Sequence, residues 1–422
     1  MTGDNGIDFR RAAEKTADVF RNSELSVLSL LALLAAGLTG KRRRARQAAH
    51  AQKAYETYMR THMAAAKAEA SALALRELRR QYEDVARRLD AFLSEQESAE
   101  TEPDALRREA EDYAQDAAAE LETAWDAGLI HMRREADDVF RWIIEETRDD
   151  HPGDALRESA QDALNRFAAQ GITGFEDAAG RRWGLAEYVD MAMRTALQRA
   201  SLEATIRSMR RHGHDLCYVN AHLGACPLCA KWEGRVMSLS GADGYPTLRQ
   251  AMDEGLFHPN CAHILQVYLP GVSRVGIGND FPAEYSAEIY QARQKQRYIE
   301  RQIRKYKRIQ AAAFTPEAER KAQARVRRWQ QAARENASFQ VQRRYDREGG
   351  RVLLSEEAKR LKPLQLDENG RALVNEAKPG HIKNPLQSDV LSAIIPSENT
   401  EAGGDGVQFP KILAMFQSAN AI

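Results

Sequence analysis

Two short stretches decide how this sequence is interpreted: CPLCAKWEGRVMSLSG, from Cys226 to Gly241, and HPNCAH, from His258 to His263. Three of the chain's four cysteines lie in them. The first holds a C-x2-C pair and the second an H-x2-C pair, separated by 28 residues. Zinc takes four such ligands in a tetrahedron, commonly two from each of two turns. The spacing predicts one structural zinc ion with four ligands: Cys226, Cys229, His258 and Cys261.

The fourth ligand has a competitor. One residue separates His263 from Cys261, and alternation along a strand would place the two side chains on the same face. His222 is a third histidine nearby, and we expect it to be a hydrogen-bonded polar residue. Two other interpretations of the cysteines stay open, as small buried apolar residues or as a disulfide or redox pair.

The sequence around the two pairs predicts a small α+β module over residues 215–272. The stretches DLCYVNAH, RVMSLS and AHILQVYLPG have strand-like composition, and PTLRQAMDEG predicts a short helix ended by glycine. A unit of this size lies close to the limit for folding alone, so a closed metal site would hold it together.

The remainder predicts a mainly α protein, with long helices flanking the module. Residues 1–95 predict a helical region, and 96–214 an acidic and then an amphipathic helical region. Within 96–214 we expect helices from Pro103 to about Gly128, over roughly 131–148 and over Leu185–Met209, with a small hairpin before the last. Residues 273–345 predict a basic helical hairpin whose second helix is capped by Thr315 and runs to about Asn336, and 346–422 predict a partly disordered tail.

The charge is segregated although the 422 residues sum to zero. Residues 94–127 hold twelve acids and two bases, a net of −10, and 291–334 hold fourteen bases and three acids, a net of +11. Such a basic segment predicts phosphate contacts without sequence readout, to double-stranded DNA. Ordinary solvated helix faces, an acidic partner surface or masking by residues 94–127 are the alternatives. The candidate DNA-binding residues are Arg293, Lys295, Arg297, Arg301, Arg304, Lys305, Lys307, Arg308, Arg325, Arg327 and Arg328.

One apolar run, Leu25–Leu38, has fourteen residues, whereas a membrane-spanning helix needs about 20. Its basic residues follow it instead of preceding it, unlike a signal peptide. We expect a helix that is buried or faces a partner, with a membrane-active segment as the alternative. The low cysteine content is typical of a reducing compartment.

Catalytic motifs do not account for the Cys/His residues. The sequence has no H-x-E for a zinc deaminase, no H-E-x-x-H for a metalloprotease, no G-x-S-x-G and no Walker A loop. HPNCAH with C-x2-C is faintly similar to zinc-stabilised HNH-type nucleases, but no separate His-Asn-His set follows. We therefore expect no enzymatic activity and no small-molecule substrate.

Four segments in order resemble the phage minor capsid proteins (minor capsid protein 2), within the broader Mu gpF-like head morphogenesis group. They are HLGACPLCAKWEGRVMSL, YPTL, GLFHPNCAHILQVYLPG and QKQRYIERQIRKYKR, and the resemblance covers roughly residues 170–345. One branch of the group has other residues at Cys226 and Cys229 and glycine at His258. The metal prediction therefore rests on this chain's own residues.

The resemblance implies a virion protein, present in few copies inside the head near the portal and made in the host cytoplasm. Its expected partners are the portal, the major capsid protein and packaged DNA, and its expected role lies in head assembly, packaging or ejection. A zinc-stabilised DNA-processing enzyme and a membrane-acting ejection protein that uses Leu25–Leu38 are the alternative functions.

Overall fold

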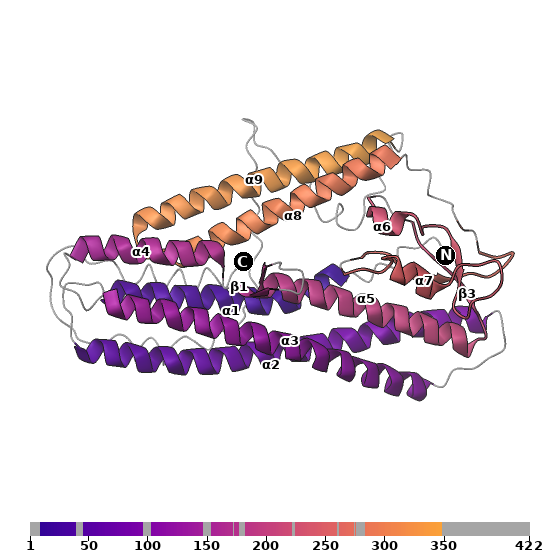
Figure 1. The fold of residues 1–422 in the computed structure, drawn as a ribbon, viewed down its shortest axis with the longest axis horizontal. Coiled ribbons are helices and arrows are strands. Elements are labelled where there is room, and N and C mark those ends of the chain that lie inside the picture. Colours follow the sequence, from indigo (N-terminus) through magenta and orange to yellow (C-terminus); the bar gives the residue numbers. More distant parts are fainter. Residues whose placement is uncertain are drawn as a thin grey trace. The chain divides into compact units, whose positions relative to one another are not determined.

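A computed structural model describes residues 9–38, 45–95, 103–146, 153–171, 173–176, 182–221, 224–259, 261–273, 275 and 283–347 (Figure 1). Long helices dominate these ranges and a small α+β module interrupts them, which confirms the predicted fold class. The helices are α1 Phe9–Leu38, α2 Ala45–Ser94, α3 Pro103–Glu146, α4 Gly153–Gln170, α5 Leu185–Arg211, α6 Pro227–Ala230, α7 Leu248–Asp253, α8 Ala283–Ala311 and α9 Pro316–Arg347. The predicted tail and His222 lie outside the described residues.

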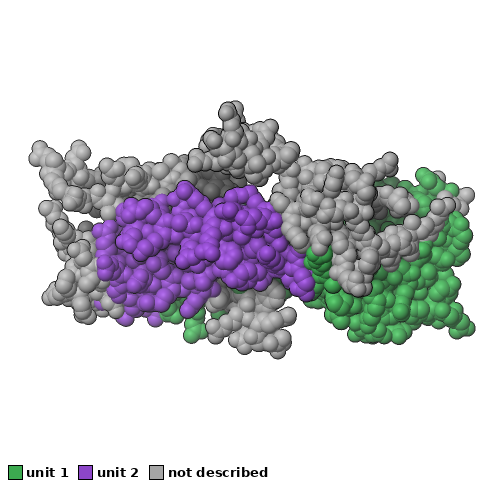
Figure 2. Space-filling view, turned by 90° about the horizontal axis from the view of Figure 1, so that it is seen from above, with its two compact units in different colours: residues 1–24, 59–138, 172–290 green, residues 25–58, 139–171, 291–422 purple. Residues whose placement is uncertain are grey.

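The chain forms two compact units (Figure 2). Unit 1 comprises residues 1–24, 59–138 and 172–290, and unit 2 comprises residues 25–58, 139–171 and 291–422. Helices α1, α2 and α3 each contribute one part to unit 1 and another to unit 2. The Cys/His module belongs to unit 1, and most of the basic helical hairpin belongs to unit 2.

The module contains a three-stranded antiparallel sheet in the order β4-β3-β5. Its strands are β3 Leu216–Val219, β4 Val236–Ser238 and β5 Leu265–Val267. All three lie in the stretches predicted as strands, and α7 lies where the short helix was predicted. Cys217 pairs with Met237 on one side and Val267 on the other, so it is central in the sheet. The predicted hairpin before α5 is also present, as β1 Thr173–Glu176 and β2 Arg182–Gly184.

Two helix-boundary predictions need revision. The chain does not break near Gly128, because α3 is continuous from Pro103 to Glu146. Glycine weakens a helix interior by about 1 kcal/mol, but here it makes room for Leu185. A Cβ added at Gly128 would lie 2.2 Å from a methyl group of Leu185. In the basic region, α9 begins at Pro316 as predicted but extends beyond Asn336 to Arg347.

A charged cluster joins α2, α3 and α5 within unit 1. The Tyr82 hydroxyl donates to Glu109 over 2.6 Å, and Glu109 also accepts from Arg207 and Arg211 over 3.0 and 2.9 Å. Arg211 donates in addition to Asp90 over 2.5 Å. One acid of the 94–127 segment is therefore neutralised inside its own unit, by bases of α5.

The apolar run Leu25–Leu38 forms the second half of α1. Val27, Leu28 and Leu31 are fully buried, which agrees with the expectation of a buried helix. Residues 11–37 are long and apolar enough by composition to cross a membrane, yet 56% of their most apolar window is buried within the protein. Core helices of soluble proteins can be equally long and apolar, so this stretch does not by itself indicate a membrane span.

Candidate functional site

The first ligand pair lies on a single turn of helix. Gly224 precedes it with φ +74°, a backbone conformation that glycine adopts without strain. Cys226 is the N-cap of α6, and Pro227 occupies the first helical position, where its missing N–H is harmless. The Cys229 N–H donates to the Cys226 carbonyl over 3.1 Å, which closes the turn and directs both thiols to the same side.

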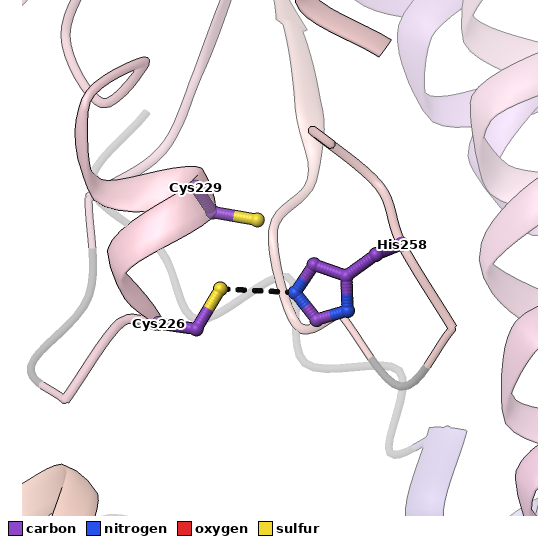
Figure 3. A group of neighbouring side chains, drawn as sticks. All are labelled: Cys226, Cys229 and His258. Carbon is purple, nitrogen blue, oxygen red and sulfur yellow. Dashed lines mark hydrogen bonds between the residues drawn. The ribbon is translucent and has the colours of Figure 1, made fainter. Parts of the chain in front are cut away.

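The second pair lies on a matching turn after α7. The Cys261 N–H donates to the His258 carbonyl over 2.9 Å. Two residues before it have positive φ, Gly255 at +103° and Phe257 at +57°. Such backbone strain in a non-glycine residue persists only where surrounding contacts enforce it. The geometry of this turn brings the imidazole of His258 to face Cys226 and Cys229 (Figure 3).

The ligand atoms form two overlapping groups that share Cys229. The first is Cys226, Cys229 and His258, and the second is Cys229, Cys261 and His263, with all ligand atoms of each group within 4.8 Å of one another. The Cys226 sulfur lies 2.9 Å from Nε2 of His258, and the sulfurs of Cys229 and Cys261 lie 3.5 Å apart. The structure thus brings all five predicted candidates to one place, with all four cysteines as free thiols.

His263 has a carboxylate partner that the sequence did not indicate. Its Nδ1 lies 3.3 Å from the Cys261 sulfur, and its Nε2 lies 2.7 Å from the carboxylate of Glu233. The imidazole is buried, with 1% of the side chain exposed. Glu233 follows Trp232 just beyond α6, where it forms an isolated bridge with Val219 of β3. Only the fold brings this glutamate next to a histidine 30 residues away.

The electrostatics of the cluster favour a thiolate. The hydrogen bond between the sulfurs of Cys229 and Cys261, helped by His263, lowers the pKa of the Cys261 thiol although burial opposes it. The same bond, together with burial, raises the pKa of Cys229. Burial lowers the pKa of His263, but its hydrogen bonds to Cys261 and Glu233 outweigh burial and raise it to about 9. Thiolates are the form of cysteine that binds metals.

The donor chemistry of this cluster fits a zinc ion. Thiol sulfur and imidazole nitrogen are the ligands that zinc takes in structural sites. Nδ1 of His258 lies 2.8 Å from the Pro259 carbonyl, the kind of outer hydrogen bond that orients a metal-binding imidazole and leaves Nε2 for the metal. The Cys/His groups of this chain could therefore bind a metal, and four protein ligands would leave no open position for substrate.

The module's apolar core surrounds this cluster. Trp232, Met237 and Leu265 are buried in the same group as Cys229 and Cys261, with Met209 of α5 and Leu93 of α2. Cys217 belongs to this core and not to either ligand group. It behaves as a small apolar residue, and burial raises the pKa of its thiol to about 12.

The predicted DNA-binding residues lie on α8 and α9, which run side by side in Figure 1. The rings of Tyr298 and Trp329 meet edge to face, with centroids 5.8 Å apart, and join the two helices. The guanidinium of Arg301 lies 5.9 Å above the Tyr298 ring. Six of the predicted residues are exposed: Lys295, Arg297, Arg301, Arg325, Arg327 and Arg328. The others are only partly exposed: Arg293, Arg304, Lys305, Lys307 and Arg308.

The turn between α8 and α9 is fixed by contacts within unit 2. The side-chain oxygen of Gln161 in α4 accepts from the N–H groups of Phe314 and Thr315 over 2.8 and 3.1 Å. Arg308 donates to the Ala168 carbonyl over 3.0 Å, so it contributes to packing. Thr315 caps α9 as predicted, with its hydroxyl oxygen accepting from the Ala318 N–H over 3.3 Å. Gln161 carried no sequence signal, because its partners are about 150 residues away.

Comparison with known proteins gives a consistent result. The family described as phage minor capsid protein 2 matches residues 38–337. A curated relative named "Structural protein", from Lactococcus phage LL-H, is 26% identical over 207 residues. That alignment covers 46% of this chain and 56% of the relative, so the chain spans little more than half of the relative's length. No solved structure matches significantly.

Proposed function

Since the chain belongs to the phage minor capsid protein 2 family, we propose that it works inside the phage head, near the portal, where it contacts packaged DNA. A structural role in the phage particle agrees with the name of its relative. We propose three features: its location inside the head, its contact with DNA, and the portal or the major capsid protein as its partner. Assembly, packaging or ejection would be the stage at which it acts.

The observation that carries the DNA proposal is the exposed basic surface of α8 and α9. The Tyr298–Trp329 contact joins the two helices. Arg301 lies three residues beyond Tyr298 on α8, and Arg325 and Arg328, three residues apart, share a face of α9. Lysine and arginine side chains that bind the phosphates of a duplex release its counterions, and these contacts do not depend on the base sequence. Such binding requires only a permanently positive protein surface on an ordered scaffold. Gln161 orders the turn between α8 and α9, so the two helices form that scaffold.

We propose that one zinc ion, bound by Cys226, Cys229, His258 and Cys261, holds the module without performing chemistry. The strands of the module have three or four residues, and its helices have four and six. Elements of this length are not stable alone, and a metal that joins two turns offsets the entropy cost of ordering them. A closed site favours this role over catalysis, so we propose a protein that is not an enzyme.

DNA binding of the full chain tests the central claim. We would measure affinity for unrelated duplexes over a range of salt concentrations, for wild type and for Arg301→Gln/Arg325→Gln/Arg328→Gln. We expect the triple variant to lose at least tenfold in affinity equally on all duplexes. The matched control, Arg76→Gln/Arg80→Gln/Arg133→Gln, removes the same charge from exposed positions of unit 1. Equal losses in both variants would reject the hairpin as the DNA-binding surface.

The location is tested on purified particles. If the protein lies inside the head, an added protease leaves it intact in whole particles and cleaves it once the heads are opened. Cleavage in whole particles at the same rate as in opened ones would place the protein outside and reject the proposal.

A further inference from the structure

His263 and Glu233 form a buried pair beside the proposed zinc ligands, and the sequence left open whether His263 is itself a ligand. The two turns of the site answer this by their likeness. In each turn, the N–H of the second member donates to the carbonyl of the first, Cys229 to Cys226 and Cys261 to His258. His258–Cys261 is thus the structural counterpart of the C-x2-C pair. His263 follows the turn and leads into β5.

Hydrogen bonds around His263 hold its imidazole ring next to Cys261. Its Nε2 meets the Glu233 carboxylate at 2.7 Å, and its backbone carbonyl accepts from the buried side chain of Gln198 in α5 over 3.4 Å. The next residue, Ile264, donates its N–H to the side chain of Asn220 over 2.6 Å. These contacts fix the ring, and they leave Nδ1 directed at the Cys261 sulfur over 3.3 Å.

Glu233 is fixed as firmly as its partner. It pairs with Val219 as an isolated bridge, and the following Gly234 N–H donates to the Val219 carbonyl over 3.4 Å. The carboxylate is mostly buried, with 11% of the side chain exposed. A buried carboxylate destabilises the fold unless it is paired and hydrogen-bonded, and His263 provides that partner for Glu233. The pair therefore ties the end of the first turn and strand β3 to the second turn.

We propose that His263 is a positioning residue and not a zinc ligand: held by Glu233, it donates a hydrogen bond from Nδ1 to the Cys261 sulfur and orients that thiolate toward the metal. This inference rests on the zinc site proposed above. Zinc has four positions, and three cysteines with His258 fill them. Outer hydrogen-bonding partners of this kind typically change metal affinity by 10–100-fold.

The test uses the full chain, with zinc and cobalt(II) as probes. We would measure zinc per chain, zinc affinity by chelator competition, and the cobalt(II) absorption spectrum for wild type, His258→Gln, His263→Gln and Glu233→Gln. We expect His258→Gln to lose the tetrahedral site. We expect His263→Gln and Glu233→Gln to keep one zinc and an unchanged sulfur-to-cobalt band, with affinity lowered by about 10–100-fold.

The outcomes separate this inference from the zinc proposal. A His263→Gln variant that loses its metal while His258→Gln keeps it would make His263 the ligand. Unchanged affinity in both His263→Gln and Glu233→Gln would reject the positioning role and leave the zinc site standing. Wild type without zinc would reject both proposals.

A measurement on wild type avoids variants that fail to fold. The ring-nitrogen NMR shifts of the zinc-loaded chain report directly which nitrogen binds metal. We expect the metal-bound shift on Nε2 of His258, and a metal-bound Nδ1 of His263 would overturn the assignment.

Discussion

The Cys/His module and the basic hairpin of α8 and α9 are ordered by different contacts. The module has strands of three or four residues, and its core combines aliphatic side chains with the cysteine sulfurs. The hairpin has helices of 29 and 32 residues that need few buried side chains, and its turn is held by hydrogen bonds from α4. A region of short strands and helices depends on a central cross-link for its stability. A region of long helices does not, so its surface can carry many charged side chains.

The largest expected effect breaks the module and spares the hairpin. Cys229 belongs to both ligand groups, so Cys229→Ser should abolish stoichiometric zinc and unfold residues 215–272. Structural zinc supplies on the order of 10 kcal/mol in small domains. Elemental analysis and hydrogen exchange would show the loss of metal and of protection in the module, with α8 and α9 still protected.

The control for this change is the fourth cysteine. Cys217 is equally buried but lies outside both ligand groups, so Cys217→Ala should keep its zinc and cost only about 1 kcal/mol of stability. A Cys229→Ser protein whose module exchanges as slowly as in wild type would contradict the idea of a metal-dependent module.

The hairpin has its own weak point at Gln161. Gln161→Ala leaves the buried N–H of Phe314 without its acceptor and removes the bond to Thr315, which should cost about 2 kcal/mol. Denaturant unfolding and hydrogen exchange at residues 312–315 would measure it. Gln331→Ala, at an exposed position of α9, should change stability by less than about 0.5 kcal/mol. Equal effects of the two substitutions would show that the turn is not held by Gln161.

A smaller effect distinguishes charge from shape on the hairpin. Each phosphate contact contributes about 0.9 to the slope of log affinity against log salt on duplex DNA. Arg301→Gln should lower that slope by about this amount, whereas Tyr298→Ala should leave it unchanged although it removes the ring beneath Arg301. Titrations at several salt concentrations measure both slopes. Identical slopes for wild type and Arg301→Gln would mean that Arg301 does not contact phosphate.

The smallest effect concerns Asp215, which lies just before β3 and outside both ligand groups. Burial raises the pKa of Asp215, but hydrogen bonds from Ser238 and Ser240 outweigh it and hold the pKa below its ordinary value. The ionised form therefore stabilises the fold above pH about 4, and this contribution is lost as the pH falls through the folded-state pKa. Asp215→Asn should lower stability by about 0.5 kcal/mol at pH 7, after allowance for solvent screening.

Unfolding curves of the zinc-loaded chain at pH 7 would measure the Asp215 effect, with Asp243→Asn at an exposed position as the charge-matched control. A difference between wild type and Asp215→Asn that is no larger than the effect of Asp243→Asn would show that the Asp215 carboxylate does not stabilise the fold.

Local signals predicted the helix and strand positions well. Pro103 and the Thr315-Pro316 pair begin helices as their chemistry requires, and Gly213 with φ +72° follows the end of α5. Gly128 misled the prediction because its effect depends on a neighbour. Leu185 packs where a Cβ would lie, so this glycine serves a close contact inside a helix.

The residues of the candidate site also fall into two classes: those that local spacing indicated and those that only the fold brings together. The C-x2-C and H-x2-C spacings could be read directly, because a turn places residues three apart on one side. Glu233 and Gln198 could not be found, since each meets His263 only through the fold.

The sequence by itself determined the mainly helical class, the small Cys/His module, the segregation of charge and the resemblance to minor capsid proteins. The helical class, the module and the charge segregation follow from periodicity, spacing and composition, which are properties of neighbouring residues, whereas the resemblance rests on four sequence segments that match in order. Only the tertiary structure decided that Glu109 is paired by α5, that Arg308 is used in packing and that His263 is backed by a carboxylate. Such pairs join segments that are 30 to 140 residues apart, and chain folding alone brings them within hydrogen-bond distance.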